Sequence, residues 1–270
     1  MRQLPSKILI KGAGDLASGT AHRLWQAGFD VVMLELPQPL VVRRSVSFAS
    51  AVYEGSVSIE GVEARCCQGI EEADRIDELL GKRIIPVFID PEGKLVQIYQ
   101  PDVLVDAILA KRNTGTSIGD APLVIGLGPG FTAGKDVHAV IETQRGHDLG
   151  RVIYNGSAAP NTGVPGDIAG FALERVLRAP AAGVFTTQKK IGDLVGEGET
   201  VATVNDVPVK AAISGVLRGL LFPGLEVEPG AKIGDIDPRG KEIAVHTISD
   251  KARSVAGGVL EAILHLSYNR

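Results

Sequence analysis

A glycine-rich turn between a short strand and a helix is the feature that most constrains how this chain folds. The apolar run KILIK at 7–11 predicts a strand that ends at the pattern Gly12-x-Gly14-x-x-Ala17. Apolar residues at helical spacing follow over 16–27, and a second β-rich run comes directly after them. This order of strand, turn, helix and strand predicts a βαβ unit at the start of the chain.

The glycine-rich turn has the composition of a phosphate-binding loop. Gly12 permits the turn, Gly14 lets the backbone approach a phosphate group, and Ala17 lets the helix pack closely on the strand. Glu35, at the end of the second strand, is placed to bind ribose hydroxyl groups. Asp15 brings a negative charge into the turn and counts against a pyrophosphate; its expected role is instead a polar contact to the cofactor or a helix cap. The alternative is a turn of the same shape that holds no ligand.

Strands and helices continue to alternate after this unit. Further elements are expected at 62–66, 70–80, 83–89, 102–112 and 123–127. The alternation predicts an α/β fold with a Rossmann-like, doubly wound parallel sheet over residues 1–178. In such a sheet, ligands bind beyond the carboxyl ends of the strands.

A sequence repeat replaces this alternation in the last third of the chain. Residues 183–204 align without a gap with residues 215–236, at a constant offset of 32, and several glycines coincide. Two equivalent sets of short strands, with a hairpin at Asn205-Asp206, predict a small all-β barrel-sandwich (lipoyl-like) domain over 179–240.

This predicted domain lacks the lysine that carries the prosthetic group in lipoyl and biotinyl domains. Val204 stands at the corresponding place, and Lys210 lies further along a strand. We therefore expect no lipoyl or biotin attachment. Residues 241–270 are expected to form a strand and an amphipathic helix that packs back on the first domain.

A second glycine-rich loop follows the strand expected at 123–127. It contains Gly126, Gly128 and Gly130, and it should share an edge of the sheet with the first loop. Its backbone amides offer a place for an anion. A tight strand exit that needs glycine explains the same residues without a ligand.

Polar and cationic residues near this edge complete the predicted cofactor-binding set. Arg145 offers paired donors to an anion, and Lys111 and Asn113 belong to a polar stretch. The segment 155–166, which includes Asn161, has the composition of a binding loop or of an interdomain linker. No catalytic residue stands out.

His138 and Glu142 fall on one face of a possible strand. They allow a metal site, a cluster that orients a ligand, or structural hydrogen bonds. We predict no metal site, because no HExxH motif or close histidine pair accompanies them. Cys66 and Cys67 are adjacent, close no useful loop, and are expected to be structural.

The composition excludes several partners. A net charge of −4 and an aromatic content of 4% disfavour nucleic acid, which needs a basic field or stacking side chains. No apolar run has the length of a membrane helix, and the first residues do not form a signal peptide. We therefore expect a cytoplasmic protein without a membrane partner.

Five segments together resemble the YqeB family. They are KGAGDLASGTAHRL, RRSVSFASAVYEG, PDVLVDAILAKRNTGT, VIGLGPGFTAGKDVHAVIETQRGHDLGRV and SAAPNTGVPG. The resemblance covers nearly the whole chain. It implies a protein of the selenium-dependent molybdenum hydroxylase system, distantly similar to XdhC/CoxF maturation factors.

The resemblance implies an accessory factor for molybdenum hydroxylases that binds a phosphate-bearing cofactor at the first glycine-rich loop. The ligand would be the molybdenum cofactor or a dinucleotide, and the partners would be a client hydroxylase and a second copy of the chain. An NAD(P)-dependent oxidoreductase is the first alternative, although the chain has no Tyr-x-x-x-Lys motif. A non-catalytic scaffold that assembles through the barrel-sandwich is the second.

Overall fold

The computed structural model describes residues 5–240 and 243–268. These residues form two compact units. The larger unit consists of Met1–Pro39, Val46–Asn161 and Ile248–Arg270, and the smaller unit of Leu40–Ser45 and Thr162–Thr247. The chain therefore leaves the larger unit twice and returns to it with its last segment.

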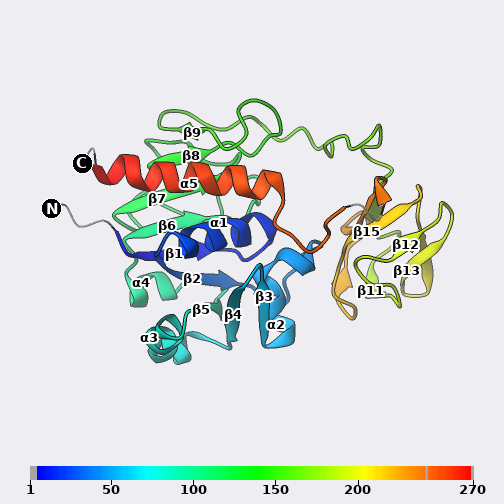
Figure 1. Cartoon of the computed structure of the whole chain (residues 1–270), viewed down its shortest axis with the longest axis horizontal. Coiled ribbons are helices and arrows are strands. Elements are labelled where there is room, and N and C mark those ends of the chain that lie inside the picture. Colours follow the sequence, from blue (N-terminus) through cyan, green and yellow to red (C-terminus); the bar gives the residue numbers. More distant parts are fainter. Residues whose placement is uncertain (1–4, 241–242, 269–270) are drawn as a thin grey trace. The chain divides into compact units, whose positions relative to one another are not determined.

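A sheet of nine strands forms the centre of the larger unit, in the order β3-β4-β5-β2-β1-β6-β7-β8-β9 (Figure 1). The strands are β1 (Lys7–Lys11), β2 (Asp30–Glu35), β3 (Ser56–Ile59), β4 (Val62–Cys67), β5 (Ile84–Ile89), β6 (Val103–Asp106), β7 (Leu123–Leu127), β8 (Ala139–Ile141) and β9 (Val152–Ile153). The strands from β4 to β8 pair in parallel, whereas β3 and β9 are antiparallel to their neighbours at the two edges.

Two long helices lie side by side on this sheet, α1 (Asp15–Gln26) and α5 (Asp250–Tyr268). They approach closely because Gly19 has no side chain: a Cβ atom there would lie 2.7 Å from the Cβ atom of Ala252. The other helices are short: α2 (Ala51–Glu54), α3 (Ile76–Gly81), α4 (Leu95–Tyr99) and the 3-10 helices Arg44–Val46, Phe48–Ser50 and Ile70–Arg75.

The prediction of a Rossmann-like, doubly wound parallel sheet is wrong. The sheet is mixed, and the alternation of strand and helix stops after β6. The connections from β6 to β7 and from β7 to β8 contain no helix. Their sequences are rich in glycine, proline, serine and threonine, which favour turns over helices. The helix that packs on β7, β8 and β9 is α5, which comes from the far end of the sequence.

The helix expected at 102–112 is also wrong, because this segment begins with the central strand β6. All four residues of β6 are buried. Asp102, expected to cap that helix, instead accepts hydrogen bonds from the backbone N–H groups of Ser6 (2.8 Å) and Lys7 (3.0 Å). A short continuous apolar run fits a fully buried strand as well as a helix, and tertiary pairing decides between them.

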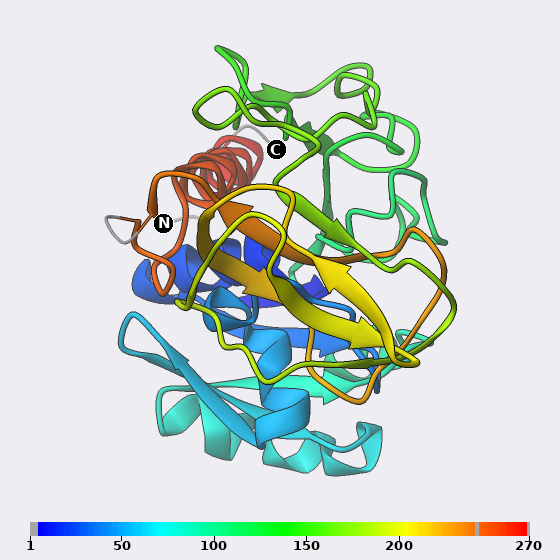
Figure 2. The ribbon, with the colours of Figure 1, turned by 90° about the vertical axis from the view of Figure 1, so that its right-hand side faces the viewer.

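The smaller unit contains two four-stranded antiparallel sheets, in the orders β10-β17-β15-β12 and β14-β13-β11-β16. Its yellow-to-orange strands face the viewer in Figure 2. The strands are β10 (Val176–Arg178), β11 (Gly183–Thr186), β12 (Leu194–Val195), β13 (Thr200–Val204), β14 (Val207–Lys210), β15 (Gly215–Leu220), β16 (Glu226–Val227) and β17 (Lys232–Asp237). Strands β11, β12 and β13 recur at the offset of 32 residues as β15, β16 and β17, and the expected hairpin at Asn205-Asp206 joins β13 to β14.

The prediction of a lipoyl-like barrel-sandwich is wrong for this unit. The sheets are two separate antiparallel sheets, and their outer strands β10 and β14 lie outside the repeated strands. The segment Leu40–Ser45 also belongs to the unit. It runs along β15, where the Val42 carbonyl accepts a hydrogen bond from the Leu220 N–H (2.8 Å) and the Arg44 Nε donates to the Leu220 carbonyl (2.7 Å).

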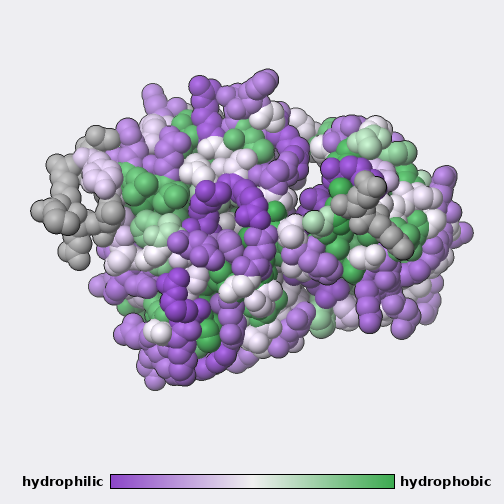
Figure 3. Space-filling view, viewed as in Figure 1, coloured by the Kyte–Doolittle hydropathy of each residue, from purple (hydrophilic) through white to green (hydrophobic). Residues whose placement is uncertain are grey.

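The central strands of the larger unit are apolar and buried. Ile8, Leu9 and Ile10 of β1 are fully buried, and hydrophobic residues of β2, β5, β6 and β7 extend this core. On the surface, hydrophilic residues cover most of the face drawn in Figure 3, and hydrophobic residues form separate patches. No helix in the described part of the chain is long and apolar enough to cross a membrane.

Candidate functional site

The first glycine-rich turn lies where the sequence predicts it, between β1 and α1. Gly12 has a φ angle of +91°, and a Cβ atom there would lie 3.0 Å from the Ala107 carbonyl oxygen. Its N–H group donates to the Leu34 carbonyl (2.9 Å). Gly12 is therefore required by the backbone of the turn itself.

Glu35 stabilises this turn from the end of β2. Its carboxylate accepts hydrogen bonds from the backbone N–H groups of Ala13 and Leu36, both at 2.8 Å. Burial raises the pKa of Glu35, although these two hydrogen bonds act in the opposite direction. The carboxylate that the sequence places near a ribose is thus used inside the turn.

Residues 48 and 49 stabilise the turn through further hydrogen bonds. Ser18 donates a hydrogen bond to the Ala13 carbonyl (3.0 Å) and accepts one from the Phe48 N–H (2.7 Å). The Ala49 N–H also donates to the Ala13 carbonyl (2.9 Å). The second half of the glycine-rich turn stays open, because Gly14, at the start of α1, provides no side-chain cap.

The glycines of the second loop, after β7, are explained by packing. A Cβ atom on Gly126 would lie 2.5 Å from the Phe131 ring, and one on Gly128 would lie 2.6 Å from the Thr143 hydroxyl. A Cβ atom on Gly130 would lie 2.7 Å from the backbone of Arg112. Close packing therefore accounts for all three glycines in this structure.

A polar network holds the loop after β6. Lys11 donates to the Thr116 hydroxyl (2.9 Å) and forms an ion pair with Asp120 (3.7 Å), while Thr116 donates to Asp106 (2.6 Å). The Asn113 side chain accepts from the N–H of Thr116 (2.8 Å) and donates to the Thr116 carbonyl (2.7 Å). Asn113 thus shapes the loop.

Two other predicted residues are exposed on loops. Lys111 has a positive φ angle of 63° in the loop after β6, and Asn161 lies at the end of the larger unit. The structure gives neither of them a defined position relative to a ligand. Their predicted binding roles stay predictions.

The Glu142 carboxylate, just after β8, is buried and holds the following loop. It accepts hydrogen bonds at 2.7 Å from the backbone N–H groups of Thr143, Gln144 and Ala159. The ring of His138, the residue predicted to share its face, accepts a hydrogen bond through Nδ1 from the backbone of β7 (2.9 Å). Among the residues that the structure describes, no group of three His, Cys, Asp or Glu side chains could hold a metal ion.

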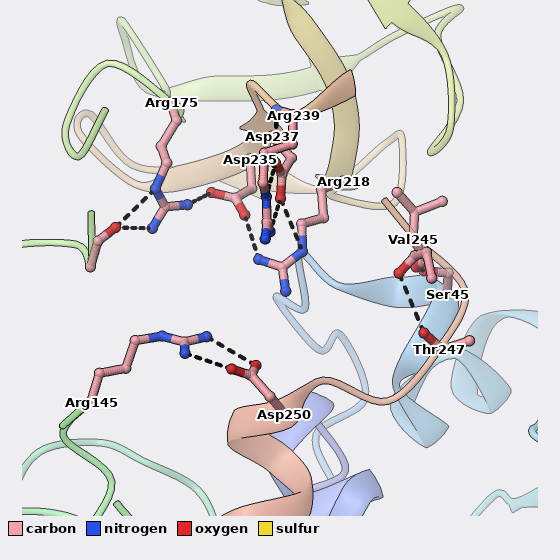
Figure 4. Close-up of polar contacts among 12 residues, drawn as sticks. Ser45, Arg145, Arg175, Arg218, Asp235, Asp237, Arg239, Val245, Thr247 and Asp250 are labelled. Carbon is pink, nitrogen blue, oxygen red and sulfur yellow. Dashed lines mark hydrogen bonds and ion pairs between the residues drawn. The ribbon is translucent and has the colours of Figure 1, made fainter. Parts of the chain in front are cut away.

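Arg145 lies at the same edge and forms an ion pair with the first residue of α5. Its two terminal nitrogens contact the two carboxylate oxygens of Asp250 at 2.9 and 3.3 Å (Figure 4). Both partners are exposed, so this pair is weak and can be exchanged for another anion. The guanidinium predicted to contact an anion therefore pairs with a carboxylate at the beginning of α5.

Lys251 is the functional candidate that the sequence interpretation missed. It lies in the first turn of α5, and its charged neighbours are Asp15, Glu142, Arg145 and Asp250. Its amine makes no hydrogen bond or close ion pair with any residue that the structure describes. Burial lowers the pKa of the Lys251 amine, the Arg145 charge acts in the same direction, and the three carboxylates oppose them.

The position of Lys251 is fixed by interactions around the beginning of α5. Ser249 caps the helix, since its hydroxyl accepts a hydrogen bond from the Ala252 N–H (3.2 Å). Glu60, at the tip of the β3–β4 hairpin, accepts from the Ile248 N–H (2.8 Å) and from Arg253 at 2.7 Å through both carboxylate oxygens. The helix therefore starts at a defined place.

The sequence carries one signal for Lys251. A lysine in the first turn of a long helix faces the positive end of the helix dipole, where cations are unfavourable. Such a local conflict often marks a functional residue. The signal becomes specific only when the structure brings the residue within electrostatic reach of Asp15 and Glu142, which are far away in the sequence.

Comparison with known proteins identifies a close sequence relative. The chain is 52% identical over 261 residues to the Escherichia coli (strain K12) protein described as "Uncharacterized protein YqeB". The similarity to this YqeB protein extends over nearly the whole of the chain. It covers 97% of the chain and 48% of the relative, so the chain spans about half the length of this YqeB protein. No protein-family model matches the chain.

Solved structures resemble the chain only weakly. The product-bound ectoine utilization protein EutE (DoeB) of Ruegeria pomeroyi has a TM-score of 0.23 and 19% identity, covering 31% of this chain and 27% of its own. An aspartoacylase family protein of Mesorhizobium loti has 0.25 and 10%, covering 79% and 58%. A succinylglutamate desuccinylase/aspartoacylase of Rhodobacter sphaeroides has 0.27 and 14%, covering 87% and 85%.

These comparisons correct the predicted function. The three structures above are described as an ectoine utilization protein, an aspartoacylase family protein and a succinylglutamate desuccinylase/aspartoacylase, and none as a maturation factor. The prediction of an accessory factor for molybdenum hydroxylases is therefore wrong. Likenesses with TM-scores this low do not transfer an activity either. The function of the chain has to be argued from its own residues.

Proposed function

We propose that the larger unit binds a small anionic ligand, through a phosphate group, at the edge of the sheet where β1 and β8 end. Lys251 would be the cation that contacts the phosphate. The observation that carries this proposal is the Lys251 amine, which is partly buried beside the start of α1 and has no partner within the described part of the chain.

The beginnings of α1 and α5 support the proposal. Both helices exceed ten residues, and their side-by-side packing at Gly19 and Ala252 brings their first turns together. The N-terminus of a helix offers free backbone N–H groups and a positive partial charge to an anion. Gly14 leaves the start of α1 without a side-chain cap, so the backbone there is open to a ligand.

The charges around Lys251 define the chemistry of the ligand. A partly buried amine that keeps its proton is stabilised by negative charge, and Asp15, Glu142 and Asp250 act on it without a hydrogen bond or close ion pair. A phosphate group carries the charge and the acceptor oxygens that the amine and the helix N-termini lack. The molybdenum cofactor and a dinucleotide both carry such a group and are proposed as ligand classes on this basis alone.

Isothermal titration calorimetry with pyrophosphate and with NAD tests the proposal. We expect binding to the wild-type chain and at least tenfold weaker binding after Lys251→Met, because the substitution removes the charge and keeps much of the side-chain volume. Lys82→Met is the matched control. Lys82 is exposed just before β5, at the amino end of the parallel strands, and its amine pairs with Glu78.

The outcomes separate clearly. Weaker binding to the Lys251 variant with unchanged binding to the Lys82 variant supports the site. Absence of binding to the wild-type chain at high micromolar concentrations of both probes, or equal affinity of the Lys251 variant, contradicts it. Association with a molybdenum hydroxylase and with a second copy of the chain stay predictions.

A further inference from the structure

The loop that follows β6, residues 107–116 (the β6 loop), packs against both glycine-rich loops of the larger unit. A Cβ atom on Gly12 would lie 3.0 Å from the Ala107 carbonyl oxygen, and one on Gly130 would lie 2.7 Å from the backbone of Arg112. Strand β6 pairs in parallel with β1 on one side and β7 on the other. The β6 loop therefore lies between the turn after β1 and the loop after β7, beyond the carboxyl ends of these strands.

Hydrogen bonds fix both ends of the β6 loop. Asp106, the last residue of β6, accepts a hydrogen bond from the Thr116 hydroxyl (2.6 Å), which itself accepts one from Lys11 at the end of β1 (2.9 Å). The Asn113 side chain holds the second half of the loop through the backbone of Thr116. Asp106 and Thr116 are both buried, so water does not compete for these bonds. The backbone of the β6 loop is thus already ordered before a ligand binds.

Two residues of the β6 loop have a backbone conformation that disfavours a side chain. Leu109 and Lys111 have φ angles of +60° and +63°, in the left-handed region that suits glycine. Such residues persist only where the surrounding structure holds them, and they concentrate at ligand-binding sites. Position 111 therefore carries a lysine although a glycine would fit the backbone better.

The Lys111 side chain is exposed and has no partner in the described part of the chain. Lys11, at the base of the same loop, is different: it donates to Thr116 and pairs with Asp120. The polar groups at the base are thus engaged with one another, and the charge of Lys111 is left for a ligand. It lies beyond the carboxyl ends of parallel strands, where ligands of α/β sheets bind.

We propose that Lys111 binds the second phosphate of a ligand with two linked phosphate groups, the first of which is held by Lys251. This inference rests on the proposed function and narrows its ligand to diphosphates. The β6 loop packs on Gly12, in the turn that leads into α1, and so borders the first phosphate site. Asp15 would repel a second phosphate held inside this turn, whereas Lys111 would hold it outside the turn. The ordered backbone presents the amine with little loss of conformational entropy on binding.

Calorimetry at constant ionic strength tests this role, with inorganic phosphate and pyrophosphate as probes. The wild-type chain should bind pyrophosphate more tightly than phosphate. Lys111→Met should weaken pyrophosphate binding about tenfold and leave phosphate binding unchanged, because it removes one charge-assisted contact to the second phosphate alone. Lys251→Met should weaken the binding of both probes, and Lys111→Arg should keep the preference for pyrophosphate.

Two further variants separate a binding role from a structural one. Lys135→Met is the matched control, because Lys135 is exposed on the neighbouring loop after β7 and has no left-handed backbone. It should keep the preference for pyrophosphate. Lys111→Gly removes the same charge as Lys111→Met and also relieves the backbone, so it should lose the preference and raise Tm.

Three results would overturn the proposal while leaving phosphate binding at Lys251 intact. They are unchanged pyrophosphate binding in Lys111→Met, an equal loss in Lys135→Met, and a lower Tm in Lys111→Gly, which would show that Lys111 supports the fold. A wild-type chain that binds neither phosphate nor pyrophosphate would instead refute the proposed function, and this inference with it.

Discussion

Buried carboxylates are held in different ways in the two units. In the larger unit, Glu35 and Glu142 accept hydrogen bonds from backbone N–H groups. In the smaller unit, Asp235 and Asp237 are held by guanidinium groups. Both arrangements satisfy the acceptors, but they have opposite consequences for the cations nearby.

Carboxylates that bind backbone amides shape loops and leave nearby cations without a partner. Both Glu142 oxygens accept hydrogen bonds from backbone N–H groups, including those of the loop that follows β8. The Lys251 amine has no hydrogen bond or close ion pair within the described part of the chain. Carboxylates that bind arginines instead pair with the cations around them: Arg175 contacts Asp235, and Arg218 lies 3.8 Å from Asp235 and 4.0 Å from Asp237. In the larger unit, the cation without such a partner is the candidate for ligand binding.

The largest loss of unfolding free energy is expected when one of the aspartates bound by arginines is removed. Asp235→Ala leaves Arg175, Arg218 and Lys232 without their shared anion, and loss of one partner of a buried ion pair costs about 3–5 kcal/mol of unfolding free energy. Urea denaturation measures this loss. Glu226→Ala, at an exposed residue of the same unit, is the control. A loss below about 1 kcal/mol would show that the cluster does not stabilise the unit.

A smaller loss of unfolding free energy is expected when a carboxylate bound by backbone N–H groups is changed. Glu142→Gln keeps the shape of the side chain but replaces an acceptor with a donor that faces a backbone N–H group. An unsatisfied buried amide costs about 1–3 kcal/mol. Hydrogen exchange should show faster exchange of the Thr143, Gln144 and Ala159 amides, with little change in β1. Unchanged exchange at these amides would contradict the role of Glu142.

The packing of α5 on the larger unit provides a test with an internal control. A methyl group on Gly258 would overlap with the Gly150 carbonyl oxygen, whereas one on Gly257 has open space around it. Gly258→Ala is expected to destabilise the chain by about 1–3 kcal/mol. Gly257→Ala should stabilise it by up to about 1 kcal/mol through helix propensity. Equal effects of the two substitutions would mean that α5 is packed differently.

The smallest loss of unfolding free energy is expected for the ion pair between Glu60 and Arg253, beside the beginning of α5. Burial alone would raise the pKa of Glu60, but hydrogen bonds from Arg253 and Ile248, together with the charges of Arg253 and His22, outweigh it and lower the pKa. Glu60 therefore stabilises the fold above its ordinary pKa of 4.5, and this contribution is lost as pH falls through its lower folded-state pKa. Glu60→Gln should cost about 0.2–1 kcal/mol at neutral pH.

Denaturation curves of wild-type and Glu60→Gln chains between neutral pH and about pH 3 measure this contribution. The difference between them should shrink as pH falls below the ordinary range of a glutamate. A difference that stays constant over this range would show that the Glu60 charge does not contribute.

The sequence predicts the local elements well and the long-range ones poorly. The first βαβ unit, the hairpin at Asn205-Asp206 and the repeated strands are set by turn residues and short-range patterns, and all are present in the structure. The segment 102–112 fails because an apolar run of this length fits either a strand or a helix until its neighbours are known.

The candidate site depends on contacts that no local pattern reveals. Gly12 and Gly14 are correctly placed in a strand-to-helix turn, since that turn is encoded within a few residues. Lys251 reaches the same edge only because α5 packs beside α1 across most of the chain length. Glu142 is held by backbone amides, and a backbone amide has no sequence signature.

Lysine-selective NMR tests the central claim, that the Lys251 amine has no partner within the described chain and binds an anion. Reductive methylation with ¹³C-formaldehyde labels the amines, Lys251→Arg assigns the resonance, and a pH titration gives its pKa with and without pyrophosphate. We predict a pKa of Lys251 below the ordinary lysine value of 10.5 in the free protein, and a rise on adding pyrophosphate, because a bound anion favours the charged amine. A Lys251 amine that titrates at the ordinary lysine value and does not respond to pyrophosphate would contradict the account.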